Sequence, residues 1–265
     1  MQEYFGSSIY ELSIKEAIKR GFLVPYRFFV SFCELNTTEY NKYKQLSIKI
    51  AQLFSRGNPD EDRLQYLLRQ RSQIVSTCSS KLVTLREILS NFNNYYNTLI
   101  YTAENKNFFD ETINILEEMN IVTLKITADI NKADRIDVIE KFVKKDIHCI
   151  LAMRCLDEGV DIPSADKAII LASSTNSKQY IQRRGRVLRK DKEGKKKSAD
   201  IYDFLVVPPE FVSQADRELF ERELKRILEF ASAASNYNAV HDIISYSQKN
   251  ALMRNFINIF KEYNL

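Results

Sequence analysis

The chain has 265 residues, of which 45% are apolar and 28% are charged, so it can bury one substantial core and a smaller helical appendage. No apolar run approaches the ~20 residues of a bilayer span, which excludes a membrane-spanning helix and makes the cytoplasm the expected location. The four cysteines and two histidines show no zinc-ligand spacing, so we expect no metal site.

The net charge of +4 is concentrated in one stretch of the chain. Residues 183–197 contain nine Lys or Arg and two acids, a local charge of +7 that leaves −3 for the remaining residues. A positive patch of this density attracts polyanions such as nucleic acid. A solvated surface loop is the alternative interpretation.

The first 90 residues are predicted to be mostly helical. Ser13 and Glu16 have the spacing of a capping box, which predicts a short helix over residues 11–21. A strand is predicted over residues 26–35. Longer helices are predicted over residues 37–54, 60–75 and 79–89.

From residue 97 onward, short apolar runs alternate with amphipathic segments. The apolar runs cover residues 98–102, 121–126, 147–152, 167–172 and 199–206. The helical candidates cover residues 106–119, 132–144 and 177–188. This alternation indicates a parallel sheet with right-handed crossovers, in which ligands bind beyond the carboxyl ends of the strands.

We therefore divide the chain into three parts. Residues 91–207 are predicted to form an α/β domain with one parallel sheet, which the Pro208-Pro209 pair closes. Residues 208–265 are predicted to be a helical extension, and residues 1–90 a mainly helical linking segment. Helices in the extension are predicted over residues 214–232, 239–247 and 249–263.

The most informative segment is residues 182–189, with the sequence QRRGRVLR. In a helix, Gln182, Arg186 and Arg189 share one face, so two guanidinium groups and an amide point to the same place. Guanidinium forks bind phosphate oxygens and stay charged when desolvated. An exposed basic helix that pairs with local carboxylates is the alternative.

A second segment, residues 157–163 with the sequence DEGVDIP, follows the predicted strand at 147–152. Gly159 permits a tight loop and the close approach of another backbone, and Asp161 has the carboxylate to accept hydrogen bonds from a sugar hydroxyl. Taken alone, the segment is typical of an acidic turn before a proline.

Together, these two segments resemble motifs V and VI of superfamily 2 helicases and translocases, and the chain is most similar to the XPB-like and restriction-type DNA translocase branch. The sixth motif has the pattern Q-x-x-G-R-x-x-R, which this chain matches at Gln182, Gly185, Arg186 and Arg189. The resemblance implies the second lobe of a motor, with a RecA-like three-layer α/β/α parallel sheet and added N-terminal and C-terminal helices. Residues 98–102 resemble motif IV.

The resemblance also implies roles at a nucleotide site. Arg186 and Arg189 resemble arginine fingers that reach the γ-phosphate of ATP held on the opposite lobe, and Gln182 is expected at the interface between lobes. Asp161 is expected near the ribose of ATP. Glu158 and Gly159 are expected where the nucleotide site meets the nucleic-acid site.

By analogy with the family, further residues are expected to contact nucleic acid. Thr127, Asn105 and Arg154 each lie in a loop at the carboxyl end of a predicted strand, where both lobes of such proteins hold the sugar-phosphate backbone. Lys195 and Lys196 lie in the basic stretch and are expected to touch duplex or a flanking strand. DNA is the expected partner, and RNA is the alternative.

The chain lacks two motifs of the family. It contains no G-x-x-x-x-G-K-[ST] phosphate loop and no D-E-x-H or D-E-x-D box. We therefore expect ATP and Mg²⁺ to be held by a first RecA-like lobe, of which residues 1–90 contain a residual segment and a linker. The chain alone is expected to be inactive as an ATPase.

Three hypotheses about function follow from the sequence. The first is the C-terminal half of an ATP-dependent DNA helicase or translocase. The second is a restriction-type translocase that moves along double-stranded DNA without strand separation. The third is a non-catalytic nucleic-acid-binding or interaction module that has kept the helicase-like fold.

Overall fold

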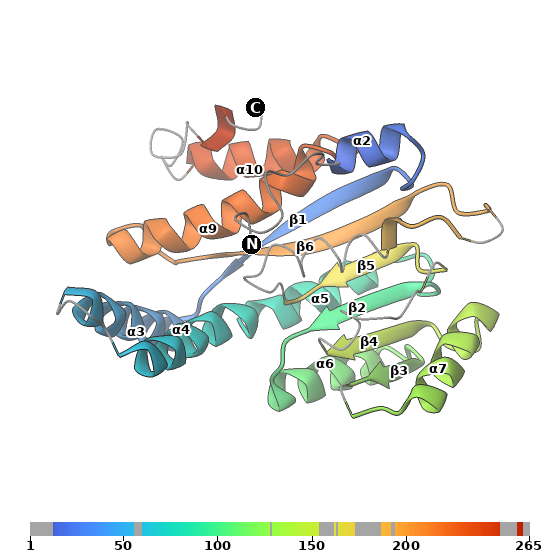
Figure 1. Ribbon diagram of the computed structural model, residues 1–265, viewed down its shortest axis with the longest axis horizontal. Coiled ribbons are helices and arrows are strands. Elements are labelled where there is room, and N and C mark those ends of the chain that lie inside the picture. The colour runs from blue at the N-terminus through green and yellow to red at the C-terminus, as the bar shows by residue number, and fades with distance from the viewer. Residues whose placement is uncertain are drawn as a thin grey trace, which may run out of the picture.

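Six parallel strands form a single sheet in the computed structural model, with helices on both faces (Figure 1). The structure describes residues 13–55, 60–127, 129–153, 162, 164–172, 187–191, 194–249 and 259–261. The strand order is β1-β6-β5-β2-β4-β3. The strands are β1 (Tyr26–Glu34), β2 (Thr98–Thr102), β3 (Thr123–Ile126), β4 (Cys149–Met153), β5 (Lys167–Ile170) and β6 (Ala199–Val207).

Two layers of helices bury the two faces of the sheet. One face packs against α2 (Ile14–Lys19), α7 (Lys132–Lys144), α9 (Gln214–Ala231) and α10 (Asn238–Lys249). The other face packs against α5 (Ser80–Ser90), α6 (Lys106–Glu118) and the first turns of α3 (Thr37–Ser55). The central strand β2 is buried at every position, as expected where helices cover both faces of a parallel sheet. The predicted three-layer α/β/α sheet with added terminal helices is therefore confirmed.

A helical hairpin projects from this body (Figure 1). Its two arms are α3 and α4 (Glu61–Ser76), which pack against each other. The hairpin has a small core of its own, made by Ile50, Leu53 and Leu67.

The strand order identifies the topological switch point of the sheet. From β2 the chain proceeds to β3 and β4 on one side, whereas β5 and β6 lie on the other side of β2. The carboxyl ends of β2 and β5 therefore border the crevice where ligands bind in open parallel sheets.

Most predicted elements are confirmed, with small shifts at their ends. Residues 98–102 and 132–144 match β2 and α7 at both ends, and the Ser13 hydroxyl accepts a hydrogen bond from the Glu16 amide at 3.2 Å, as the N-cap of α2. β3 begins at Thr123 because the buried Ile121 packs into the core before the chain enters the sheet. The predicted helix over 177–188 lies outside the described residues except for its last two, which are helical.

The sheet extends beyond the segment predicted to contain it. β1 comes from the first 90 residues, yet it pairs with β6 along its whole length, from Tyr26 opposite Ala199 to Glu34 opposite Val207. Helices α9 and α10, from the segment after residue 207, pack on β6 and β1. The division into 1–90, 91–207 and 208–265 stays a prediction, but all three parts contribute to one core.

Ser235 and Asn236 cover part of the outer edge of β1, which pairs with no other strand among the described residues. Ser235 donates two hydrogen bonds to the Tyr26 carbonyl, from its amide and its hydroxyl, both at 2.8 Å. The Asn236 carboxamide accepts from the Phe28 amide at 2.7 Å and donates to the Phe28 carbonyl at 3.0 Å. These contacts satisfy backbone groups that an edge strand otherwise leaves open.

We expect Asn236→Ala to lower the free energy of unfolding by about 2 kcal/mol, because it leaves two half-buried backbone groups of Phe28 without their partner. Urea denaturation followed by circular dichroism measures the change. The matched control is Asn107→Ala on the exposed face of α6, which should shift stability by less than about 0.5 kcal/mol. Equal effects of the two substitutions would contradict the role of Asn236.

Candidate functional site

Two of the predicted nucleic-acid residues lie at the carboxyl edge of the sheet. Asn105 follows β2 and is the N-cap of α6, where its side chain accepts a hydrogen bond from the Phe108 amide at 3.0 Å. Thr127 follows β3, and hydrogen bonding from Thr127 lowers the pKa of the neighbouring Asp129 carboxylate. The structure therefore brings both residues to the expected edge, although β4 separates their strands.

The basic residues lie at the opposite edge. Arg189 forms an isolated antiparallel bridge with Leu23, and the Val24 amide donates to the Leu188 carbonyl at 2.8 Å. Both contacts lie just before the amino end of β1. Arg189 is exposed at this position. Residues 194–198, which include Lys195 and Lys196, then lead into the amino end of β6. These lysines therefore lie at the edge of the sheet opposite to Thr127 and Asn105.

The two predicted lysines of this stretch have different surroundings. The Lys196 ammonium donates to the backbone carbonyls of Ala165 and Val187, and the residue is half-buried. It thereby joins the segment before β5 to the segment that carries Arg189. Lys195 is exposed, as is Lys197, whose ammonium donates to the Gly194 carbonyl at 2.9 Å.

One carboxylate holds residues 194–198, which we call the basic loop. The Asp191 side chain accepts hydrogen bonds from the backbone amides of Lys196 at 2.9 Å and Lys195 at 3.1 Å. These amide bonds, with that of Lys196 the larger cause, lower the pKa of Asp191. The basic loop is therefore a turn with its own internal bonds.

The remaining predicted site residues lie outside the described part of the chain. They are Gln182, Arg186, Glu158, Gly159, Asp161 and Arg154. Their roles stay predictions.

A buried lysine at the carboxyl edge was not predicted from the sequence. The Lys81 side chain is 3% exposed, and its ammonium donates to the carbonyls of Leu171 at 2.7 Å, Val75 at 2.8 Å and Ser76 at 3.4 Å. Leu171 directly follows β5, and Val75 and Ser76 end α4. A signal for this burial exists in the sequence, because Lys81 lies four residues before Leu85 on the same apolar face of α5.

Three further buried charges lie beside Lys81. The Arg226 guanidinium binds Asp203 at 2.9 Å and Glu223 at 2.8 Å, and it also donates to the Phe204 carbonyl at 2.8 Å. Burial raises the pKa of Asp203, against the opposing effect of Arg226. With Lys81, the cluster contains two cations and two acids, so its formal charges balance.

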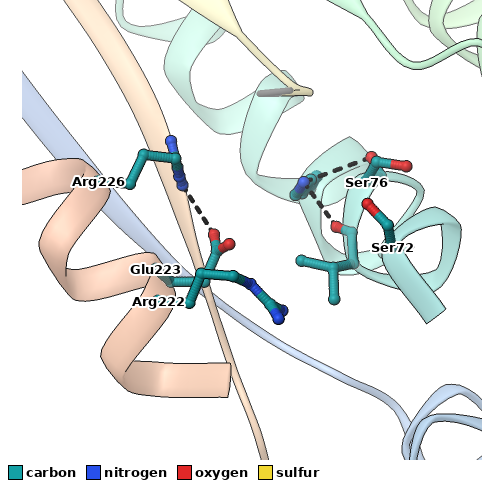
Figure 2. A pocket seen from close by; sticks show the side chains of 7 residues that line it. Ser72, Ser76, Arg222, Glu223 and Arg226 are labelled. Atoms are coloured by element: carbon teal, nitrogen blue, oxygen red, sulfur yellow. Dashed lines mark hydrogen bonds and ion pairs between the residues drawn. The ribbon is translucent and has the colours of Figure 1, made fainter. Parts of the chain in front are cut away.

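A small cavity adjoins this cluster, between α4, α5 and α9 (Figure 2). Its lining includes Ser72 and Ser76 from α4, and Arg222, Glu223 and Arg226 from α9. Its volume of about 20 Å³ is enough for a water molecule but not for a substrate-sized group. Lys81 therefore ties the carboxyl end of β5 to the end of α4, and Arg226 ties α9 to β6, so the cluster is a structural support of the edge rather than a ligand pocket.

Within the described residues, no group of three or more His, Cys, Asp or Glu is placed to hold a metal ion. None of the described helices is long and apolar enough to cross a membrane.

Part of the chain is similar to known proteins. Residues 80–191 match the family model of the helicase conserved C-terminal domain. The DNA 3'-5' translocase XPB2 of Sulfurisphaera tokodaii is 27% identical over 208 residues, which cover 71% of this chain and 46% of that protein. The probable ATP-dependent RNA helicase DDX47 of Homo sapiens is 27% identical over 126 residues, 48% of this chain and 25% of that protein. This chain thus spans less than half the length of these relatives.

A solved structure shares the fold. The Sulfolobus solfataricus SWI2/SNF2 ATPase core, solved in complex with dsDNA, has a TM-score of 0.54 to this chain. The alignment covers 69% of this chain and 41% of the other, at 17% sequence identity. At this identity the likeness shows the fold alone.

We expect Lys81→Met to destabilise the fold by about 3 kcal/mol, because it leaves two buried carbonyls and one half-buried carbonyl without this donor and unbalances the charges around Arg226. Thermal and urea unfolding measure the effect. Lys49→Met, on the exposed face of α3, is the matched control and should be nearly neutral. A Lys81→Met protein as stable as the control would show that the ammonium is dispensable.

Proposed function

We propose that this chain, which carries the C-terminal lobe of a superfamily 2 helicase or translocase near the XPB-like branch, works as the second RecA-like lobe of an ATP-dependent DNA motor. The observation that carries the proposal is the match of the helicase C-terminal domain to residues 80–191. This range includes both the 157–163 segment and the 182–189 segment, whose residue types suit a nucleotide site. The fold of the described sheet supports the same proposal.

The proposed contribution of this lobe to hydrolysis is a pair of arginine fingers. Negative charge on a transferring phosphoryl group is stabilised by an arginine from another domain, an effect of about 10³ to 10⁵ in rate. Arg186 and Arg189 are proposed for this role, with Gln182 at the lobe interface. Of these, Arg189 is the residue that the structure describes: it is exposed, and it lies beside Leu23 at the amino edge of the sheet. Closure of the lobes then couples hydrolysis to movement.

The remaining nucleotide contacts are proposed from the same resemblance. Asp161 would bind the ribose, with Glu158 and Gly159 at the junction to the nucleic acid. The triphosphate and Mg²⁺ would be held by the first lobe, because this sequence contains no phosphate loop or acidic box. The chain alone is therefore proposed to be inactive as an ATPase.

The proposed nucleic-acid partner is DNA. Thr127 and Asn105 lie at the carboxyl edge, where Arg154 would complete a surface that holds the sugar-phosphate backbone. The Sulfurisphaera tokodaii DNA translocase aligns with 71% of this chain and the human RNA helicase with 48%, and this favours DNA over RNA. Lys195 is proposed to add a backbone contact at the opposite edge.

In the polypeptide that joins this chain to its first lobe, we expect Arg186→Ala and Arg189→Ala each to lower kcat for DNA-stimulated ATP hydrolysis by about 10³-fold. DNA affinity should change little, because the fingers act on the phosphoryl group. Steady-state ATPase assays and fluorescence anisotropy measure the two quantities. The matched control is Lys190→Ala, which removes a neighbouring positive charge, and normal turnover in both arginine variants would refute the assignment.

The basic loop yields a second expectation. The double variant Lys195→Gln/Lys197→Gln should weaken binding to duplex DNA at low salt and make the slope of log K against log salt less negative by up to about 2, one unit per lost phosphate contact. Lys196→Gln should instead lower the melting temperature, because it loses two backbone carbonyl partners. Lys249→Gln, exposed on α10, is the control for both measurements. Equal DNA affinity of the double variant and the control at low salt would make the loop a solvated turn.

A further inference from the structure

Six half-buried rings form a continuous row on one side of the molecule. Successive ring centroids in the row are between 4.6 and 6.5 Å apart. In order, the rings of this aromatic row belong to Phe29, Tyr202, Phe92, Tyr95, His148 and Tyr96.

The row crosses most of the width of the sheet. Phe29 on β1 and Tyr202 on β6 stack at 4.9 Å with an interplanar angle of 16°. Phe92 follows the end of α5, the two tyrosines precede β2, and His148 precedes β4. The row thus runs from the face of β1 and β6, past the end of α5, to the amino ends of β2 and β4. It lies away from the carboxyl edge where Thr127 and Asn105 are found.

The helices explain why these rings stay partly open. On the same face, Cys33 of β1 and Phe204 of β6 are 1% exposed, because they lie nearer the carboxyl ends in the core beneath α3, α5 and α6. Phe29 and Tyr202 lie earlier on the same strands and are only half-buried. The face is therefore covered over its carboxyl half and partly open over its amino half.

Each end of the row carries a cation. The Arg27 guanidinium lies 5.6 Å from the Phe29 ring centroid and is held by Asp200 through two hydrogen bonds of 2.8 and 2.6 Å. The Lys145 ammonium lies 6.0 Å from the Tyr96 ring centroid. Lys145 is exposed, and the Arg27 side chain is 58% exposed with its charge balanced by Asp200, so both groups reach solvent at the ends of the row.

The row is held in place by backbone contacts. The Val122 amide donates to Nδ1 of His148 at 2.9 Å, which fixes the orientation of that ring between Tyr95 and Tyr96. The Lys167 ammonium donates to the Tyr96 carbonyl at 3.1 Å and to the Asn94 side chain at 3.4 Å, so the loop before β2 is tied to the start of β5. A preorganised set of rings loses little entropy on binding a flat partner.

We propose that the aromatic row is a stacking platform for the unpaired bases of a nucleic-acid strand. Base stacking on aromatic side chains tolerates any base sequence, because every base has a π-face, and flanking cations hold the phosphates of the same strand. The choice of nucleic acid as the partner rests on the proposed function. The site is additional to it, because the platform lies apart from the backbone contacts proposed at the carboxyl edge.

The first test maps the contact on the unaltered chain. A single-stranded oligodeoxythymidine carrying 5-iododeoxyuridine is irradiated with the 265-residue chain at low salt, and the crosslinked residues are identified by mass spectrometry. We expect crosslinks at Tyr96, Phe92 or Tyr202. Crosslinks confined to residues outside the row would overturn the proposal.

The second test separates stacking from backbone binding. Fluorescence anisotropy compares an oligodeoxythymidine with an abasic strand of equal length. Phe92→Leu/Tyr96→Leu should lose at least about fivefold in affinity for the first strand and little for the second. Tyr237→Leu, at a tyrosine that is 81% exposed in the connection between α9 and α10, is the matched control and should bind both strands normally.

The outcomes of these tests are distinct. If the unaltered chain binds both strands equally and the double variant behaves as the control does, the row serves packing alone, while the proposed function stands. If the chain binds neither strand at low salt, the nucleic-acid partner of the proposed function is contradicted, and the platform with it. Thermal melting of each variant shows whether a loss of affinity reflects unfolding.

Discussion

The pairing of β1 with β6 is the constraint on which the rest of this structure depends. Nine residue pairs in parallel register join a strand near the start of the described chain to one that follows residue 198. This register places Arg27 opposite Asp200 and Phe29 opposite Tyr202, and it brings the residues before β1 against Arg189. These three features of the amino edge therefore follow from a single alignment of two strands.

Local sequence patterns predicted the elements well where the physical cause is local. The N-cap of α2 needs only Ser13 and the amide of Glu16, and the apolar run at 98–102 needs no partner to be identified as a buried strand. In contrast, the pairing of β1 with β6 depends on residues that no local window contains together. The prediction of a sheet within 91–207 accordingly found five of its strands and assigned the sixth to a linking segment.

The candidate site shows the same division between local and distant causes. Residue type and helical spacing single out the 182–189 segment, which lies largely outside the described residues, so its chemistry still depends on the resemblance. Lys196 was expected to touch nucleic acid because of its charge, but its two carbonyl partners, Ala165 and Val187, come from segments that only the fold brings together. Charge alone does not distinguish a lysine that meets solvent from one that joins two segments. Lys81 is the extreme case, because its three partners end two different elements.

The distance in sequence between β1 and β6 has a consequence for the order of folding during synthesis. Arg27 and Asp200 are 173 residues apart, and at about 5 to 20 residues per second a ribosome needs roughly 10 to 30 s to reach β6 after it has made β1. Over that interval the apolar residues of β1 have no partner strand, although α3, α4 and α5 can form from local contacts. The nascent chain therefore carries β1 unpaired until β6 has been made, and exposed apolar residues of this kind are what chaperones bind.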